Sequence, residues 1–79
     1  MLRHMIKKNI SLNPTQVKDF VLAASKCDFD VDIYYNRYVV DAKSILGVFG
    51  LDLTHPLTVE YSGYDKEFEQ YLDGLVIAG

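Results

Sequence analysis

Cysteine, tryptophan and proline are scarce in this chain. Its 79 residues include one cysteine, two prolines and no tryptophan. The single thiol, Cys27, excludes an intramolecular disulfide and fits a reducing compartment. Apolar runs are also short: none approaches the roughly 20 residues that a membrane-spanning helix needs, and the N-terminus has none of signal-peptide length. These absences predict a cytoplasmic protein without membrane insertion.

Positively charged residues are also few. The chain has 8 Lys and Arg residues against 11 Asp and Glu residues, which gives a net charge of -3. Its lysines are scattered, whereas nucleic-acid binding needs a clustered basic patch, so we expect no nucleic-acid partner. The content of 49% hydrophobic and 24% charged residues is that of an ordinary globular fold. We expect one small domain over residues 1–79, without linkers or repeats.

Residues suited to catalysis or metal binding are few. His4, His55 and Cys27 match no zinc spacing, so we expect no metal or other cofactor. The sequence shows no catalytic carboxylate pair and no nucleophile triad. The glycines at 47 and 50 have neither the spacing nor the lysine of a P-loop. We therefore expect that the chain is not an enzyme.

Hydrophobic periodicity predicts seven elements. Alternation of apolar and polar residues indicates strands, and apolar residues at i, i+3, i+4 and i+7 indicate helices. Asn13-Pro14 is a start signal, because asparagine caps helices well and proline is favoured at the first helical position. In order, the expected elements are a strand over 2–10, a helix over 14–26, a hairpin over 30–41, a short helix over 44–50, a strand over 57–61 and a helix from about residue 65.

The order βαββαβα favours an α+β two-layer sandwich, in which an antiparallel sheet carries the helices on one face. The hairpin turn falls at Asn36-Arg37, and asparagine tolerates the positive φ of a tight turn. The pattern leaves the strand order open.

Residues 41–51, Asp-Ala-Lys-Ser-Ile-Leu-Gly-Val-Phe-Gly-Leu, carry the most specific signal. Ser44 stands just before a short apolar run, where its hydroxyl can cap a helix. The segment closely resembles the regulatory-serine region of HPr, the phosphocarrier of the bacterial sugar phosphotransferase system. Weaker support comes from Ala24-Ser25-Lys26. The resemblance implies the HPr fold, an open-faced β-sandwich, and supplies its strand order.

The resemblance also reveals a loss. In HPr the phosphoryl-carrying histidine begins the first long helix, inside a Gly-x-His-Ala-Arg-Pro motif. Matching back from Ala24-Ser25-Lys26 places Asn13 at the histidine and Thr15 at the arginine. An amide nitrogen is not nucleophilic at neutral pH, so Asn13 cannot accept a phosphoryl group, although the helix start should still present free N–H groups. From the residues alone, Asn13 is a plain helix cap.

Ser44 is the stronger candidate for function. The resemblance implies phosphorylation of this serine by an ATP-dependent HPr kinase, followed by binding to a transcriptional regulator of carbon catabolite control. The partner-binding residues it implies are Lys43, Ile45, Leu46, Phe49 and Leu51. The other interpretation is that Ser44 is only a cap and that the apolar residues are core. One helical turn cannot bury all of them, which predicts some exposed apolar surface.

The chain thus resembles the histidine-less catabolite-repression HPr homologue, which keeps the serine and lacks the histidine. The leading hypothesis is a regulatory binding module whose partners are HPr kinase, a carbon-control regulator or phosphotransferase-system components. A second hypothesis is a phosphocarrier with an unusual acceptor, His55, in the loop that lies near the phosphorylation site in HPr. A third is a degenerate relative with new partners. Cys27 and His4 are expected to be structural.

Overall fold

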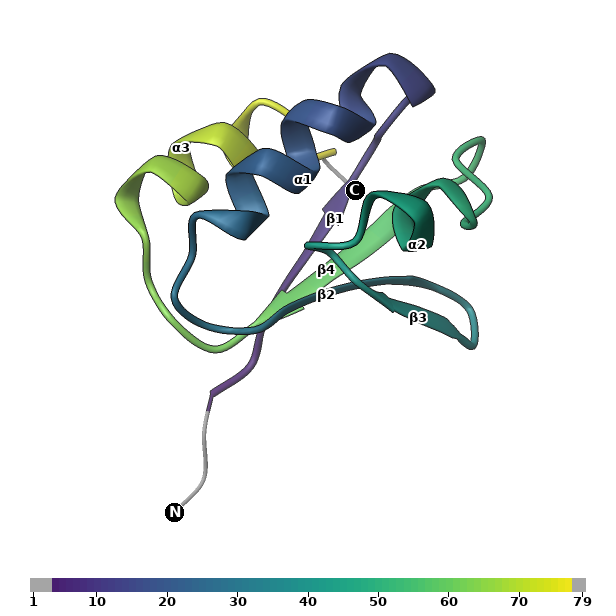
Figure 1. Cartoon of the computed structure of the whole chain (residues 1–79). Helices are drawn as coiled ribbons and strands as arrows, with labels where there is room; N and C mark the ends of the chain where they lie inside the picture. The colour runs from purple at the N-terminus through teal and green to yellow at the C-terminus, as the bar shows by residue number, and fades with distance from the viewer. Residues whose placement is uncertain (1–3, 78–79) are drawn as a thin grey trace.

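The structure, a computed structural model, describes residues 4–77. One four-stranded sheet carries the helices on a single face (Figure 1). The strands are β1 (Ile6–Ile10), β2 (Val31–Tyr35), β3 (Tyr38–Asp41) and β4 (Leu57–Tyr61); the helices are α1 (Val17–Ser25), α2 (Ile45–Phe49) and α3 (Lys66–Asp73), with a 3-10 turn η1 (Pro14–Gln16) before α1. This arrangement confirms the predicted α+β open-faced sandwich of order βαββαβα.

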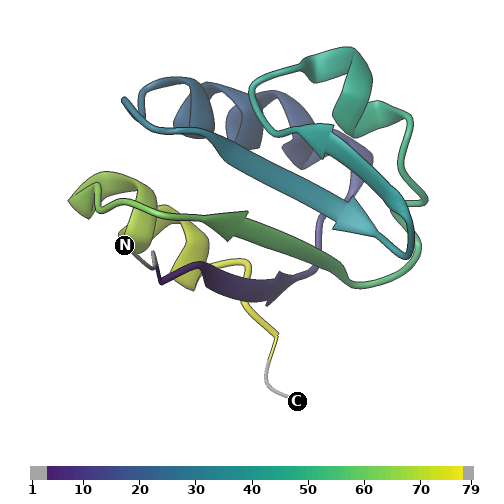
Figure 2. The same ribbon diagram turned by 90° about the horizontal axis from the view of Figure 1, so that it is seen from below.

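The strands lie in the order β1-β4-β2-β3, and every neighbouring pair is antiparallel. β4, the last strand in sequence, therefore lies between β1 and β2 (Figure 2). β1 and β3 form the two edges of the sheet. This is the information that the periodicity could not supply.

Side chains of one sheet face and one stripe of each helix form the core. In β4, Leu57, Val59 and Tyr61 are buried, while Thr58 and Glu60 lie on the opposite face. The buried residues of α1 are Val17, Phe20, Val21 and Ala24. Both sets are those that period-two and period-3.6 patterning predict.

Element boundaries differ from the predicted ones where capping decides them. The expected helix over 14–26 begins as the 3-10 turn η1, because Asn13 caps this turn through its side chain and Pro14 lacks an N–H. The first strand begins at Ile6; of its predicted residues, 2 and 3 lie outside the described part of the chain. The hairpin turn has the expected positive φ, 55° at Asn36.

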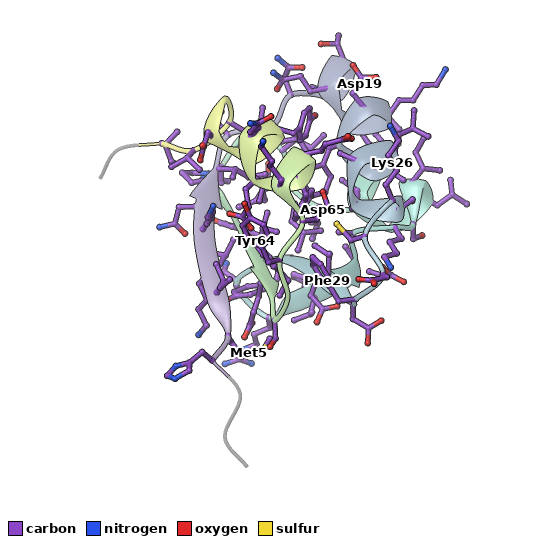
Figure 3. All side chains as sticks on the ribbon, turned by 90° about the vertical axis from the view of Figure 1, so that its left-hand side faces the viewer. Met5, Asp19, Lys26, Phe29, Tyr64 and Asp65 are labelled. Carbon is purple, nitrogen blue, oxygen red and sulfur yellow. The ribbon has the colours of Figure 1, made fainter. Side chains whose placement is uncertain are left out.

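Aromatic rings pack between the sheet and the helices, and Figure 3 labels one of them, Phe29. Phe29, between α1 and β2, stacks on Tyr61 of β4 with ring centroids 5.8 Å apart. Phe68 of α3 meets the same tyrosine edge-on, at 5.3 Å. Gly63 follows β4 beneath the Phe29 ring, and a Cβ there would overlap that ring. The close approach requires glycine at this position.

A charged network joins α3 to the sheet from within the sandwich. One carboxylate oxygen of Glu69 accepts a hydrogen bond from the Lys8 ammonium of β1, and the other accepts one from the Tyr61 hydroxyl, both at 2.5 Å. Burial and the hydrogen bond to Glu69 raise the pKa of Tyr61. The phenol therefore stays protonated and donates at neutral pH.

Candidate functional site

Ser44 caps α2 as predicted. Its backbone is extended, and its Oγ accepts a hydrogen bond from the Gly47 N–H at 3.1 Å. The preceding turn is held by Asp41, whose Oδ1 accepts from the Lys43 N–H and whose carbonyl accepts from the Ser44 N–H. Ser44 is exposed. The hydroxyl is thus fixed at the start of α2 and open to solvent.

The apolar surface of α2 consists of Ile45, Leu46 and Phe49, and we call these three residues the α2 surface. All three are exposed, and Leu46 is 82% exposed. The helix turns its other side to the sheet: Val48 is buried, and a Cβ on Gly47 would lie 3.2 Å from the Cβ of Val40 in β3. The expectation of exposed apolar surface at this helix is confirmed.

Two predicted partner-binding residues also serve the fold. Leu51 is 6% exposed, because the chain turns inward just after α2 and packs this residue into the core. Lys43 is half-buried, and its ammonium donates to the carbonyl of Cys27 at 2.9 Å. Lys43 thereby ties the start of α2 to the end of α1.

Asn13 and Thr15 form a closed cap at the start of the first helix. The Asn13 side-chain oxygen accepts hydrogen bonds from the Gln16 N–H at 3.1 Å and from the Thr15 hydroxyl at 2.6 Å, and the Gln16 side chain accepts from the Asn13 N–H. The N–H of Val17 donates a hydrogen bond to the carbonyl of Pro14. The expectation of free N–H groups here was largely wrong, because this cap uses them internally and Pro14 has none.

His55 lies against the hairpin. Its ring stacks on Tyr35 with centroids 4.9 Å apart, and its Nε2 is 3.5 Å from a carboxylate oxygen of Asp52. Hydrogen bonds from the Thr54 hydroxyl and N–H lower the pKa of Asp52. Among residues 4–77, no hydrogen bond or ion pair joins His55 to Asn13. The structure gives His55 a packing role in this loop.

Cys27 is buried at the end of α1. Its Sγ lies 3.8 Å from the Ala23 carbonyl. Burial and the nearby Asp65 raise the pKa of the thiol, which keeps it protonated. Among residues 4–77, no group of three or more His, Cys, Asp or Glu side chains is placed to hold a metal ion. The helices in this part of the chain are also not long and apolar enough to cross a membrane.

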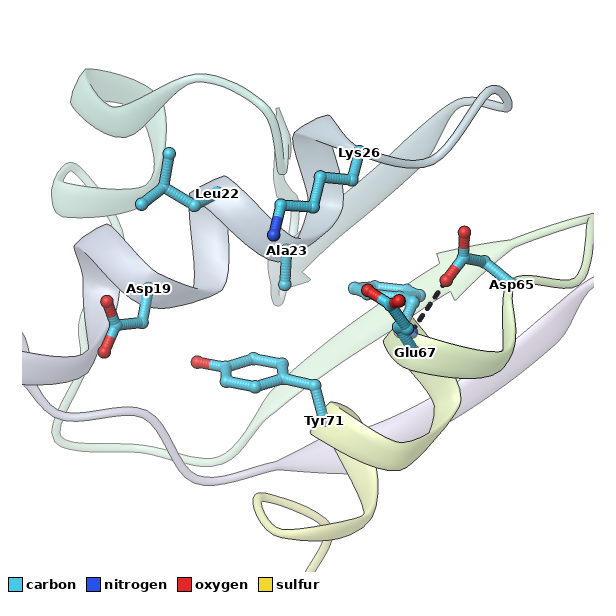
Figure 4. Close-up of a pocket in the computed structure, with 8 residues that line it drawn as sticks. Asp19, Leu22, Ala23, Lys26, Asp65, Glu67 and Tyr71 are labelled. Carbon is cyan, nitrogen blue, oxygen red and sulfur yellow. Dashed lines mark hydrogen bonds between the residues drawn. The ribbon is translucent and has the colours of Figure 1, made fainter.

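A groove of about 350 Å³ between α1 and α3 was missed by sequence reasoning. Its lining residues are Asp19, Leu22, Ala23, Lys26, Asp65, Glu67, Phe68 and Tyr71 (Figure 4). Three carboxylates against one lysine disfavour phosphate binding. Burial and Asp19 raise the pKa of Tyr71, whose hydroxyl points across the groove. One signal in the sequence could have indicated the groove. The lining residues at positions 19, 22, 23 and 26 have the i, i+3, i+4, i+7 spacing of one helical face, next to the buried stripe of α1.

The open face of the sheet carries an acidic row across three strands. Asp32 of β2 lies directly opposite Asp41 of β3 on one side and Glu60 of β4 on the other. We call these three residues the acidic row. Lys7 of β1 is the next cross-strand partner, opposite Glu60. Burial and the charges of Asp41, Asp30 and Glu60 raise the pKa of Asp32. Like charges in directly opposite positions destabilise a sheet.

Neutralising the centre of this row should stabilise the protein. We expect Asp32→Asn to raise the free energy of unfolding at pH 7 by about 0.5 kcal/mol, measured by urea unfolding. Because the folded pKa of Asp32 is raised, the gain exists where the carboxyl is charged and disappears as the pH falls through that pKa. Asp28→Asn, outside the row, is the matched control. An equal gain from both variants would assign the effect to net charge alone.

Solved structures of HPr proteins share this fold. The crystal structure of a phosphocarrier protein HPr from Bacillus anthracis str. Ames matches with a TM-score of 0.70 and 26% sequence identity, over 92% of this chain and 98% of that one. HPr-C-His from Thermoanaerobacter tengcongensis matches with a TM-score of 0.64 and 23% identity, over 96% and 91%, which shows the fold alone.

No protein-family model and no curated protein sequence matches the chain. The likeness to the Bacillus anthracis structure and the resemblance of residues 41–51 both indicate an HPr-like protein. A phosphocarrier is not an enzyme, which agrees with the expectation from the missing catalytic motifs. The chain is therefore an HPr-like protein.

Proposed function

We propose that this HPr-like protein is a regulatory binding module of the phosphotransferase system that has lost phosphoryl transfer. The observation that carries the proposal is the juxtaposition at α2: an exposed Ser44 hydroxyl stands at the start of a helix whose neighbouring residues Ile45, Leu46 and Phe49 are exposed and apolar. Such a patch beside a modifiable hydroxyl suits a protein partner whose binding is switched by phosphorylation.

Phosphorylation would change this site in a defined way. A phosphate on Ser44 adds about 1.5 to 2 negative charges at neutral pH. The positive end of α2 stabilises that charge, and the Gly47 N–H that now donates to the Ser44 oxygen can donate to a phosphate oxygen instead. The helix would keep its cap while the α2 surface gains a charged recognition group. HPr kinase and a carbon-control regulator are the proposed partners.

The closed cap at Asn13 supports the loss of phosphoryl transfer. A cap built from Asn13, Thr15 and Gln16 supplies neither a nucleophile nor a guanidinium for phosphate oxygens. His55, the alternative acceptor, is held against Tyr35 and beside the negative Asp52, which disfavours the approach of a phosphoryl donor.

The test of this proposal is modification followed by binding. Incubation with an HPr kinase and ATP should add one phosphate, which Ser44→Ala abolishes and Ser25→Ala, an exposed serine at the end of α1, does not. The readout is intact-protein mass spectrometry. A kinase that phosphorylates an authentic HPr but leaves this protein unmodified would make Ser44 a structural cap only.

The α2 surface is tested separately. Leu46→Ser should leave the free energy of unfolding of the unphosphorylated protein unchanged, because Leu46 is 82% exposed. It should weaken binding of the phosphorylated protein to the carbon-control regulator by about tenfold, as loss of an exposed apolar anchor does. Isothermal titration calorimetry measures the change, with Leu22→Ser on α1 as an exposed apolar control. Equal losses from both variants would remove the α2 surface from the interface.

A further inference from the structure

The β3 edge of the sheet is open to another strand. β3 pairs with β2 on one side only, and Figures 1 and 2 show it as the outermost strand on this side of the sheet. Tyr38 is 73% exposed and Val39 is 59% exposed. Natural sheets protect such edges with short strands, charged residues, proline or bulges. β3 is short, with the four residues Tyr-Val-Val-Asp, and its single charge is at the end of the strand; it has no lysine or proline.

The register determines which backbone groups face outward. The N–H of Ala42 donates to the carbonyl of Val31 in β2 at 2.8 Å. Antiparallel strands alternate hydrogen-bonded and non-hydrogen-bonded pairs. The backbone groups of Tyr38 and Val40 therefore face β2, as those of Ala42 do. The backbone groups of Val39 and the N–H of Asp41 face the free edge, while the carbonyl of Asp41 already accepts a hydrogen bond from the Ser44 N–H. A second strand can therefore pair with both groups of Val39 and with the Asp41 N–H without disturbing the existing sheet.

We propose that two copies of this chain associate by antiparallel pairing of β3 with β3, with Val39 opposite Val39 of the second copy. In this register the outward groups of the two Val39 residues bond to each other. Asp41 then lies opposite Arg37 of the second copy, and Tyr38 lies beside Val40 of the second copy. The sheet becomes continuous over eight strands across a two-fold axis, and the exposed Tyr38 and Val39 side chains become packed.

Charge selects this register and this partner. Each Arg37 meets the Asp41 of the second copy, so the dimer holds two opposite-charge pairs in directly opposed positions. A register moved by one residue along each strand would instead place Arg37 opposite Lys43, which are like charges. Asp41 is also the end of the acidic row, so an incoming Arg37 would offset the repulsion that Asp41 and Asp32 share in a single copy. The net charge of -3 opposes association only weakly at physiological salt.

Charge reversal and mixing test this dimer. Sedimentation equilibrium of the parent, from about 10 µM to about 1 mM, should show a monomer–dimer equilibrium. Arg37→Asp and Asp41→Arg should each weaken self-association by about tenfold or more, because each places two like-charge pairs in the dimer. An equimolar mixture of the two variants should recover association to the parent's level, since every pair in that heterodimer is opposite in charge.

A second pair of variants separates this edge from other surfaces. Val39→Pro removes an N–H that the single copy directs outward, so it should abolish the dimer while circular dichroism stays that of the parent. Leu46→Ser on the α2 surface should leave the dimer unchanged. The proposal is overturned if the parent is monomeric throughout, if the mixture associates no more than its components, or if only Leu46→Ser removes the dimer.

Discussion

Replacing Glu69 with alanine should lower the free energy of unfolding at pH 7 by about 3 kcal/mol, because the change removes two hydrogen bonds to a charged group. Lys8 would lose its anionic partner, and the Tyr61 hydroxyl, on a residue that is fully buried, would lose its acceptor. A loss of this size is a large share of the 5–15 kcal/mol typical of a whole domain, as a rough guide. Urea unfolding followed by circular dichroism measures it.

The effect should depend on pH with a definite sign. Burial favours the neutral form of Glu69, but the hydrogen bonds from Lys8 and Tyr61 outweigh burial and lower the pKa of the carboxyl. A folded pKa below the unfolded one stabilises the protein above the unfolded value, about 4.3 for glutamate. The difference between parent and variant should therefore be full at pH 7 and shrink as the pH falls through the folded pKa.

Two controls isolate the network. Glu67→Ala removes an exposed carboxylate from the same helix and should cost less than about 1 kcal/mol. Tyr61→Phe keeps the aromatic packing and removes only the hydroxyl, so it should cost about 1 kcal/mol. If Glu69→Ala costs no more than Glu67→Ala, the bonds to Lys8 and Tyr61 contribute no net stability.

Local patterns in the sequence predicted most of the fold because local physics decides those features. The cap at Asn13, the cap at Ser44 and the buried stripe of α1 each depend on residues within about one helical turn of one another. The strand alternation that buries Val59 needs only period two. The pairing of Lys8 with Glu69 joins residues 61 positions apart in the sequence. A local sequence pattern cannot predict a contact between residues so far apart.

The α2 surface shows where sequence reasoning stopped. Counting apolar residues around a single helical turn was enough to predict that some are exposed, and Leu46 is. The same count could not place Leu51, because its burial depends on the direction that the chain takes after the helix ends. The hydrogen bond of Lys43 to the Cys27 carbonyl was unpredictable for a similar reason, because it depends on the packing of α2 against α1.

The double substitution Asn13→His and Thr15→Arg should give the protein a phosphoryl acceptance that the parent lacks. The imidazole supplies a nucleophilic nitrogen, and the guanidinium supplies paired donors for phosphate oxygens. The substitution also opens the present cap. With the Asn13 side-chain oxygen gone, the Gln16 N–H keeps only its hydrogen bond to the Asn13 carbonyl, and the Thr15 side chain no longer closes the start of the first helix.

The measurement is the initial rate of label uptake from phosphoenolpyruvate through enzyme I of the phosphotransferase system. We expect no acid-labile label on the parent or on Thr15→Arg alone, a low rate for Asn13→His, and the highest rate for the double variant. Recovery should be partial, since Pro14 fixes a backbone angle within the 3-10 turn η1. Label on the parent that disappears in His55→Gln would instead establish His55 as the acceptor.

The fold should tolerate the double substitution, because the lost cap is worth about 1 kcal/mol and both residues are exposed. A folded double variant that takes up no more label than the parent would therefore point to recognition and not to stability. Either residues 11–16 would not occupy the place of the histidine motif, or the surface of this protein would no longer dock enzyme I. Neither failure would contradict the proposed regulatory role. That role is tested by Ser44 phosphorylation, which needs neither the histidine site nor enzyme I.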